Sequence, residues 1–161
     1  MMAQNKGKQF ESRFRQNWLE TVDDSVCYRL YDVQAGFKGV SNVGDFLCYK
    51  YPNFFIIDCK SKKGGTLPFS DIRQYEKMLE YKGISGVYTG VIIWFYEKDI
   101  VCWVPIETLE QIYKEGKKSF NIKMLNDHNY KCYNIPSKKL RTFMNTDYLE
   151  LVRYCNGEST D

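Results

Sequence analysis

The sequence contains a single histidine, His128, among its 161 residues. This scarcity argues against zinc enzymes, HNH-type nucleases and Ser-His-Asp hydrolases, because each of these needs histidine as a ligand or a base. No C-x-x-C pair occurs among the six cysteines, and metal-binding cysteines come in tighter clusters. We therefore expect reduced, structural thiols in a cytoplasmic protein.

Long apolar runs are missing as well. No run approaches the roughly 20 residues of a membrane helix, and the first ten residues lack the apolar core of a signal peptide. The net charge of +3 is too small to predict a partner by itself. A hydrophobic content of 43% predicts a globular chain. We expect one domain over residues 1–161, with frayed ends at 1–5 and 156–161.

Two acids and a lysine stand at the ends of neighbouring apolar runs. Asp45 begins one run, Asp58 ends the next, and Lys60 follows two residues later. A hairpin that pairs residues 45–50 with 54–60 would place Asp45 beside Asp58, and residues i and i+2 of a strand share a face. Two carboxylates suit Mg²⁺, and a lysine can orient or activate water or neutralise charge on a phosphoryl group. The pattern predicts a phosphodiesterase site, with a surface salt-bridge cluster as the alternative.

The same acid-x-lysine spacing occurs at Glu115-Gly-Lys117. That copy follows a helical segment in a lysine-rich polar stretch. No strand presents it and no second acid pairs with it, so we do not expect it to form a site.

The remaining pattern predicts an α/β fold with a central mixed β-sheet flanked by helices. A helix over 5–21 carries the apolar stripe Phe10, Phe14 and Trp18. Glu11 lies beside this stripe and could reach over the sheet edge, or it could be a solvated partner of Arg15. The further expected elements are strands over 26–32, 45–51, 54–58, 87–95, 100–104 and 130–135, helices over 70–82 and 106–115, and a strand or helix over 148–154.

Several finer features are expected around these elements. An exposed basic loop should run from Lys60 to Gly65, and a basic turn should cover 138–141. The helix over 70–82 should bury Ile72, Tyr75 and Leu79, and the helix over 106–115 should bury Tyr113. The loop over 34–43 carries Phe37 and Lys38, which could stack on a base and meet a phosphate, or form a simple turn.

The set Glu11, Asp45 and Asp58-x-Lys60, in the order helix, strand, strand, resembles the PD-(D/E)xK nuclease superfamily. Within it, the chain resembles the RecU family of Holliday junction resolvases, including its phage-encoded members. The resemblance rests on Gly7-Lys8-x-Phe10-Glu11, Gly44-Asp45-Phe46, Asp58-Cys59-Lys60-Ser61-Lys62, Leu67-Pro68-Phe69, Gln74, Arg141 and Asp147-Tyr148-Leu149.

This resemblance implies a restriction-endonuclease-like core and Mg²⁺-dependent cleavage of four-way DNA junctions by a homodimer, with Mn²⁺ as a substitute. The implied catalytic residues are Asp45, Asp58, Lys60, Glu11 and Gln74. The implied metal ligands are Asp45, Asp58, the Cys59 backbone carbonyl and Glu11, and the expected DNA contacts are Lys8, Phe37, Lys38, Lys62, Lys63 and Arg73.

The chain departs from the family pattern at three points. Asp58 stands where glutamate is common, Gly44 precedes Asp45 in place of proline or threonine, and the segment before Asp45 is shorter than the stalk of RecU proteins. Two alternatives therefore stay open. One is another PD-(D/E)xK nuclease, of the restriction, homing or repair type, that acts on duplex DNA. The other is an inactive DNA-binding or structural protein on the same core.

Overall fold

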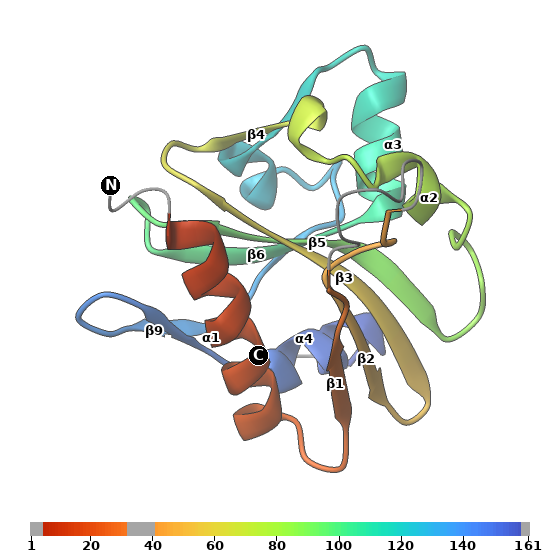
Figure 1. The fold of residues 1–161 in the computed structure, drawn as a ribbon. Helices are drawn as coiled ribbons and strands as arrows, with labels where there is room; N and C mark the ends of the chain where they lie inside the picture. Colours follow the sequence, from red (N-terminus) through yellow and green to blue (C-terminus); the bar gives the residue numbers. More distant parts are fainter. Residues whose placement is uncertain (1–4, 32–40, 159–161) are drawn as a thin grey trace.

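A computed structural model describes residues 5–31 and 41–158 of the chain. Its centre is a six-stranded sheet in the order β1-β2-β3-β5-β6-β8 (Figure 1). The strands are β1 (Val26–Arg29), β2 (Phe46–Lys50), β3 (Asn53–Lys62), β5 (Val87–Phe95), β6 (Ile100–Pro105) and β8 (Tyr133–Asn134). β3 and β5 run parallel, whereas the other neighbours are antiparallel. The predicted mixed sheet is confirmed.

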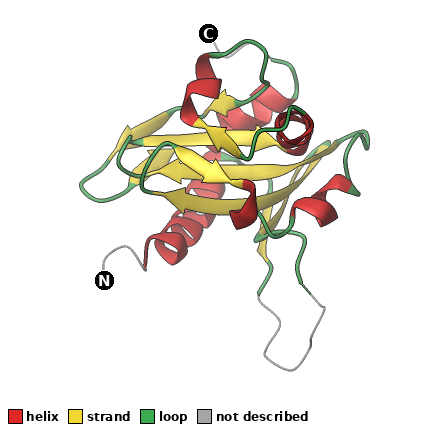
Figure 2. Cartoon of the chain, turned by 90° about the horizontal axis from the view of Figure 1, so that it is seen from above, coloured by secondary structure: helices red, strands yellow, loops and turns green. Residues whose placement is uncertain are grey.

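Helices cover both faces of this sheet, which Figure 2 shows as a layer between them. The aromatic stripe of α1 (Lys6–Thr21) packs with α4 (Tyr148–Cys155) on one face, in a core that contains Phe14, Trp18 and Tyr148. On the other face, α2 (Tyr75–Leu79) and α3 (Ile106–Lys114) form a second core with β5 and β6. None of the helices in the described part of the chain has the length and apolarity needed to cross a membrane.

Two short ribbons complete the structure. One pairs β4 (Thr66–Pro68) with β7 (Ser119–Asn121), and the other pairs β9 (Ser137–Lys139) with β10 (Met144–Thr146). Single turns of 3-10 helix lie at Phe69–Asp71 and Ile122–Asn126. The basic turn expected at 138–141 is therefore part of a β9–β10 hairpin.

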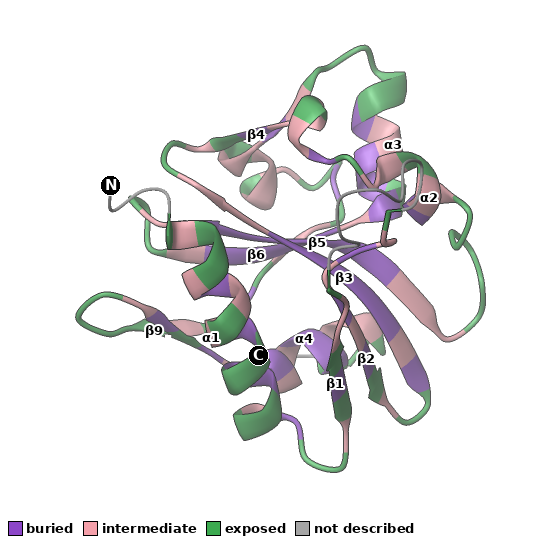
Figure 3. Cartoon of the chain, viewed as in Figure 1, coloured by how far each residue is buried: buried purple, intermediate pink, exposed green. Residues whose placement is uncertain are grey.

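β3 contributes to both cores because its side chains alternate between the two faces. Phe55, Ile57 and Cys59 belong to the core under α1. Asp58 and Lys60 project to the opposite face, where their partners on β5, Val91 and Ile93, pack against the α2–α3 core. Figure 3 shows β3 and β5 buried along most of their length. This alternation places Asp58 and Lys60, two of the predicted site residues, on the α2–α3 face of the sheet.

The prediction of a helix over 70–82 is wrong for most of that range, because α2 covers only Tyr75–Leu79. The backbone leaves helical geometry at Ile72, with φ −101° and ψ 78°, so α2 begins only at Tyr75. Met78 is the buried residue of α2, in place of Tyr75 and Leu79. In α3 the apolar side includes Ile112, while Tyr113 is 60% exposed.

Strand lengths also differ from the prediction. β3 continues to Lys62, because its parallel pairing with β5 extends to Lys62 opposite Phe95. The basic loop expected from Lys60 is therefore wrong in its first residues. β1 ends at Arg29, before the expected end at residue 32.

At the C-terminus, the segment 148–154 lies within the helix α4, whose first turn is capped by Asp147 through a 3.1 Å hydrogen bond from the Leu149 amide. In the segment expected to fray, the amides of Asn156, Gly157 and Glu158 donate to carbonyls of α4, and the fraying stays a prediction.

Candidate active site

The β2–β3 hairpin brings Asp45 and Asp58 together. Phe46 pairs with Ile57, and the Asp45 amide extends this ladder by donating to the Ile57 carbonyl at 2.9 Å. The Asp45 carboxylate accepts a 2.8 Å hydrogen bond from the Cys59 amide. The two acids, 13 positions apart in the sequence, thus lie side by side, as the hairpin predicted.

Gly44 allows this close approach. A β-carbon at Gly44 would lie 2.8 Å from the Ile57 carbonyl oxygen, which is a backbone atom that cannot swing away. A larger residue would push the chain before Asp45 off β3. This explains in physical terms why glycine stands here, where the resemblance suggests proline or threonine.

Asp58 is a fully buried carboxylate, and neither of its oxygens has a hydrogen-bond partner among the described residues. Lys60 forms an ion pair with it, with Nζ 3.0 Å from Oδ2, although the approach lacks the geometry of a hydrogen bond. Burial and then the Asp45 charge raise the pKa of Asp58 to about 7, while Lys60 opposes the rise. An unsatisfied buried carboxylate is costly, and a cation would relieve that cost.

Lys60 stays protonated in this environment. Burial alone would lower the pKa of its ammonium group, but the Asp58 carboxylate beside it raises the pKa above the usual value. Its side chain is 23% exposed, so the ammonium can meet both Asp58 and solvent. Lys60 is therefore suited to donate hydrogen bonds and positive charge, and poorly suited to accept a proton.

These residues fit a divalent cation with hard oxygen ligands. Asp45 and Asp58 supply two carboxylates, and two of their oxygens are buried without a hydrogen-bond partner. In an antiparallel strand pair, the backbone amide and carbonyl of a residue point toward the same neighbouring strand. The Cys59 carbonyl is therefore expected on the side of Asp45, which accepts from the Cys59 amide. Mg²⁺ needs only one or two carboxylates and completes its shell with water.

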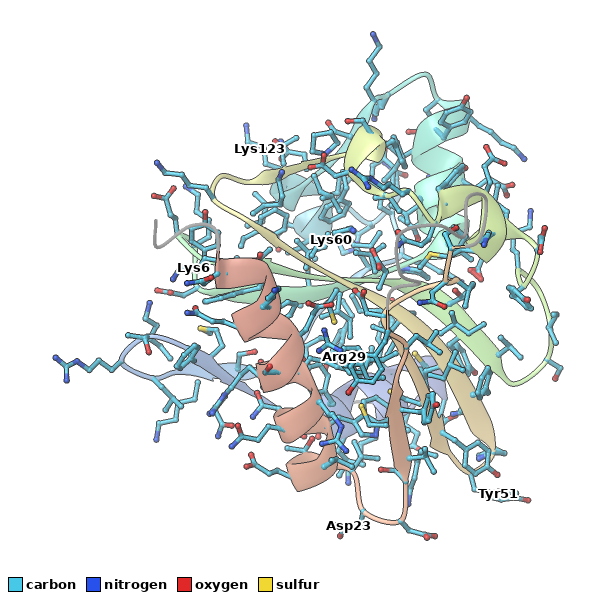
Figure 4. All side chains as sticks on the ribbon, viewed as in Figure 1. Lys6, Asp23, Arg29, Tyr51, Lys60 and Lys123 are labelled. Atoms are coloured by element: carbon cyan, nitrogen blue, oxygen red, sulfur yellow. The ribbon has the colours of Figure 1, made fainter. Side chains whose placement is uncertain are left out.

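Glu11 approaches from the other face of the sheet. Its Oε2 lies 3.5 Å from Arg29 Nη2, and Figure 4 shows Arg29 and Lys60 on opposite sides of β3. Over residues 5–31 and 41–158, no group of three or more His, Cys, Asp or Glu side chains is placed to hold a metal ion. Glu11 does, however, add to burial and the two aspartates in raising the pKa of the Cys59 thiol. Its role as an accessory acid remains a prediction.

Arg29 is the residue that sequence reasoning missed. Its guanidinium contacts Glu11 and lies 5.4 Å from the Tyr31 ring and 5.7 Å from the Phe46 ring. The alternation of β1 could have indicated it, because Cys27 is buried under α1 and Arg29, two residues later, shares that face.

The other predicted site residues are dispersed. Gln74 lies directly before α2, and its Oε1 is buried with no hydrogen-bond partner in the described structure. Lys62 Nζ forms a 2.7 Å ion pair with Asp71. Lys8, Lys63 and Arg73 are exposed. Phe37 and Lys38 lie outside the described residues, and the roles of all these residues stay predictions.

The dismissed copy of the motif behaves as expected. Glu115 and Lys117 form a 3.3 Å ion pair at the surface, and Glu115 Oε1 also accepts from the Tyr130 hydroxyl. This exposed ion pair, which has the same acid-x-lysine spacing, offers a matched control for the pair at Asp58.

Comparison with known proteins identifies the fold. No protein-family model and no curated protein sequence matches the chain. Among solved structures, the chain is similar to Hjc, a Holliday junction resolvase from the archaeal hyperthermophile Archaeoglobus fulgidus, with a TM-score of 0.54 and 16% identity. The match covers 73% of this chain and 89% of that chain. At this identity the likeness shows the fold alone, and the protein has the restriction-endonuclease-like fold that the sequence predicted.

Proposed function

We propose that this protein is a divalent-metal-dependent endonuclease that hydrolyses DNA phosphodiesters, with branched DNA as its substrate. The observation that carries the proposal is Asp58, which is fully buried, lacks hydrogen-bond partners for both oxygens, and lies beside Asp45 and Lys60. A purely structural acid would be hydrogen-bonded or replaced by an apolar residue. An acid that is retained in this state is typical of a metal site.

Asp45, Asp58 and the Cys59 carbonyl would hold Mg²⁺, and Mn²⁺ would substitute. When bound, the ion supplies charge stabilisation at the phosphoryl oxygens and lowers the pKa of a coordinated water. The Cys59 amide fixes the Asp45 carboxylate, and the buried position of Asp58 keeps the local dielectric low. Lys60 is protonated, so it orients the attacking water or neutralises charge that develops on the phosphorane.

Branched DNA is the preferred substrate class for two reasons. The fold is similar to that of Hjc, which is a Holliday junction resolvase, and the sequence motifs resemble those of RecU-type resolvases. A four-way junction offers two equivalent strands to cut, so a homodimer with two sites is the expected working unit. If the same active site cut linear duplex DNA as well as it cuts a four-way junction, branched DNA would no longer be the preferred substrate.

A cleavage assay with matched substrates tests the proposal. The protein is incubated with Mg²⁺ and either a labelled four-way junction or the linear duplex of one of its arms. We expect paired nicks in the junction, little cutting of the arm, and no product from Asp58→Asn or Lys60→Ala. Lys117→Ala, from the matched Glu115-x-Lys117 motif, should cut like the wild type. Undiminished cutting by both site variants would refute the assignment, and equal cutting of arm and junction would refute the preference for branched DNA.

A further inference from the structure

A groove lined mostly by polar residues lies between the outer face of α1 and the β9–β10 hairpin, with a volume of about 390 Å³. Lys8 and Arg13 line it together with three amide side chains, one serine and the ring of Phe143. None of the lining residues is acidic. The groove therefore presents hydrogen-bond donors and positive charge next to an aromatic surface.

The hairpin that forms one wall is firmly attached at its base. The buried side chain of Asn17 donates to Asn145 at 2.9 Å and accepts from the Thr146 amide at 3.0 Å. Arg13 Nε donates to the Met144 carbonyl at 3.2 Å, and its guanidinium lies 5.8 Å from the Phe143 ring. These contacts hold β10 against α1 and fix the shape of the groove.

The tip of the hairpin is exposed and basic. Residues 138–142 are all exposed, and they include Lys138, Leu140 and Arg141. Figure 1 shows the hairpin projecting from the body of the molecule beside α1, and Figure 3 shows its loop exposed. Lys139 is tied to Asp99 by a 2.5 Å ion pair, which steadies the hairpin against the β5–β6 turn. The hairpin therefore presents an exposed basic tip on a base that is hydrogen-bonded to α1.

The positive charges of this surface have no acidic partner in the described residues, although Arg13 donates hydrogen bonds to the Met144 carbonyl and to Gln16. Lys8, Arg13, Lys138 and Arg141 form no salt bridge with any acid in the described residues. Lys139 and Arg29, by contrast, form ion pairs with Asp99 and Glu11. A linear polyanion with a sugar between successive charges would match two cations in a groove with an aromatic wall and two more at the adjoining hairpin tip.

We propose that the α1–hairpin groove and the hairpin tip bind the sugar–phosphate backbone of a DNA arm, at a surface separate from the acids that cut. The inference rests on the proposed function, because it assigns a second contact to the same substrate. Donors from Lys8 and Arg13 meet phosphates in the groove, and Phe143 packs against a sugar. Lys138 and Arg141 contact phosphates farther along the arm. None of these contacts reads a base, so they position DNA without selecting sequence.

A salt titration tests the inference with cleavage switched off. Binding of full-length Asp58→Asn to a labelled four-way junction and to its linear arm is measured in EDTA over a series of salt concentrations. Adding Lys138→Ala and Arg141→Ala should reduce the slope of log K against log salt by about two, and adding Lys8→Ala should reduce it by about one. The matched pair Lys82→Ala and Lys114→Ala, which both contact Glu110 of α3, should leave the slope unchanged.

The outcomes separate the inference from the function beneath it. If Asp58→Asn binds DNA and the tip and groove variants keep its full salt slope, the groove is not a DNA surface, while the proposed function stands. If Asp58→Asn binds neither DNA, both the proposed function and the inference are overturned. Far-ultraviolet circular dichroism and thermal unfolding should match among the variants, because the substituted side chains are exposed.

Discussion

Replacing Asp58 by asparagine should stabilise the metal-free protein near neutral pH, although it removes a central residue of the proposed site. Asparagine keeps the shape of the side chain and resembles the neutral carboxyl. The wild-type carboxyl is fully buried without hydrogen-bond partners. Its ionisation in the folded state is therefore unfavourable, even with Lys60 nearby.

The magnitude follows from the pKa of Asp58, which burial and Asp45 raise from 3.8 to about 7. A carboxyl with a raised pKa stabilises the fold below its unfolded-state pKa, and this contribution is lost as pH rises toward the folded-state pKa. The loss falls between about pH 4 and pH 7. The lost stability is on the order of 4 kcal/mol at pH 7.5 and well under 1 kcal/mol at pH 4, at about 1.36 kcal/mol per pKa unit. For a chain of this length, 4 kcal/mol corresponds to roughly 8–16 °C in Tm.

The assay is thermal or urea unfolding of wild type and Asp58→Asn in EDTA from pH 4 to pH 8. The stability difference should grow with pH in favour of the variant. Asp71→Asn is the surface control, because Asp71 pairs with Lys62 and is 40% exposed, and its effect should stay within about 0.5 kcal/mol. Added Mg²⁺ should stabilise the wild type and Asp71→Asn, which both keep the proposed ligands, but not Asp58→Asn. A variant that is less stable than wild type at pH 7.5 would show that the buried charge is compensated, and the reasoning would fail.

Three further predictions concern the frame around the site. Gly44→Ala should cost about 1–3 kcal/mol and reduce cleavage, because its methyl group would meet the Ile57 carbonyl; unchanged urea unfolding would refute this. Asn17→Ala should cost about 2–3 kcal/mol and increase amide exchange at Thr146, which loses its acceptor, as hydrogen exchange would show. The Cys48 thiol, whose pKa is raised by burial and by Cys27, should react with a thiol reagent only at the rate of unfolding; fast labelling under native conditions would contradict the structure.

The parts of the fold with strong periodicity were predictable from sequence. The stripe Phe10, Phe14 and Trp18 fixed α1 on its face of the sheet, and the apolar run over 87–95 matches β5. The segment after Pro68 was not predictable in the same way. Ile72, Tyr75 and Leu79 have helical spacing, but the backbone at Ile72 is not helical. The Ile72 side chain is nevertheless buried in the core between the sheet and the helices α2 and α3. Spacing alone cannot distinguish these cases.

The sequence predicts those parts of the candidate site whose positions depend only on the pairing of neighbouring strands. Asp45 directly precedes β2 and Asp58 lies on β3, and a tight turn joins these two strands, so the proximity of the two acids follows from local pattern. The pairing of Glu11 with Arg29 depends on how α1 crosses β1, which no local pattern records. The sequence over 137–146 predicts only a basic turn and not a hairpin, because its exposed lysines and arginine show no alternation of apolar and polar residues.

The side chains of β3 alternate between the two faces of the sheet, and this limits the insertions that the strand can tolerate. Substitutions along the strand affect one core or the site at a time. A single-residue insertion before Asp58 would reverse every later side chain, so Asp58 and Lys60 would enter the aromatic core under α1 and Cys59 would take their place. Homologues of this protein should therefore differ freely in the lengths of their loops, while the number of residues between Asn53 and Lys60 stays constant.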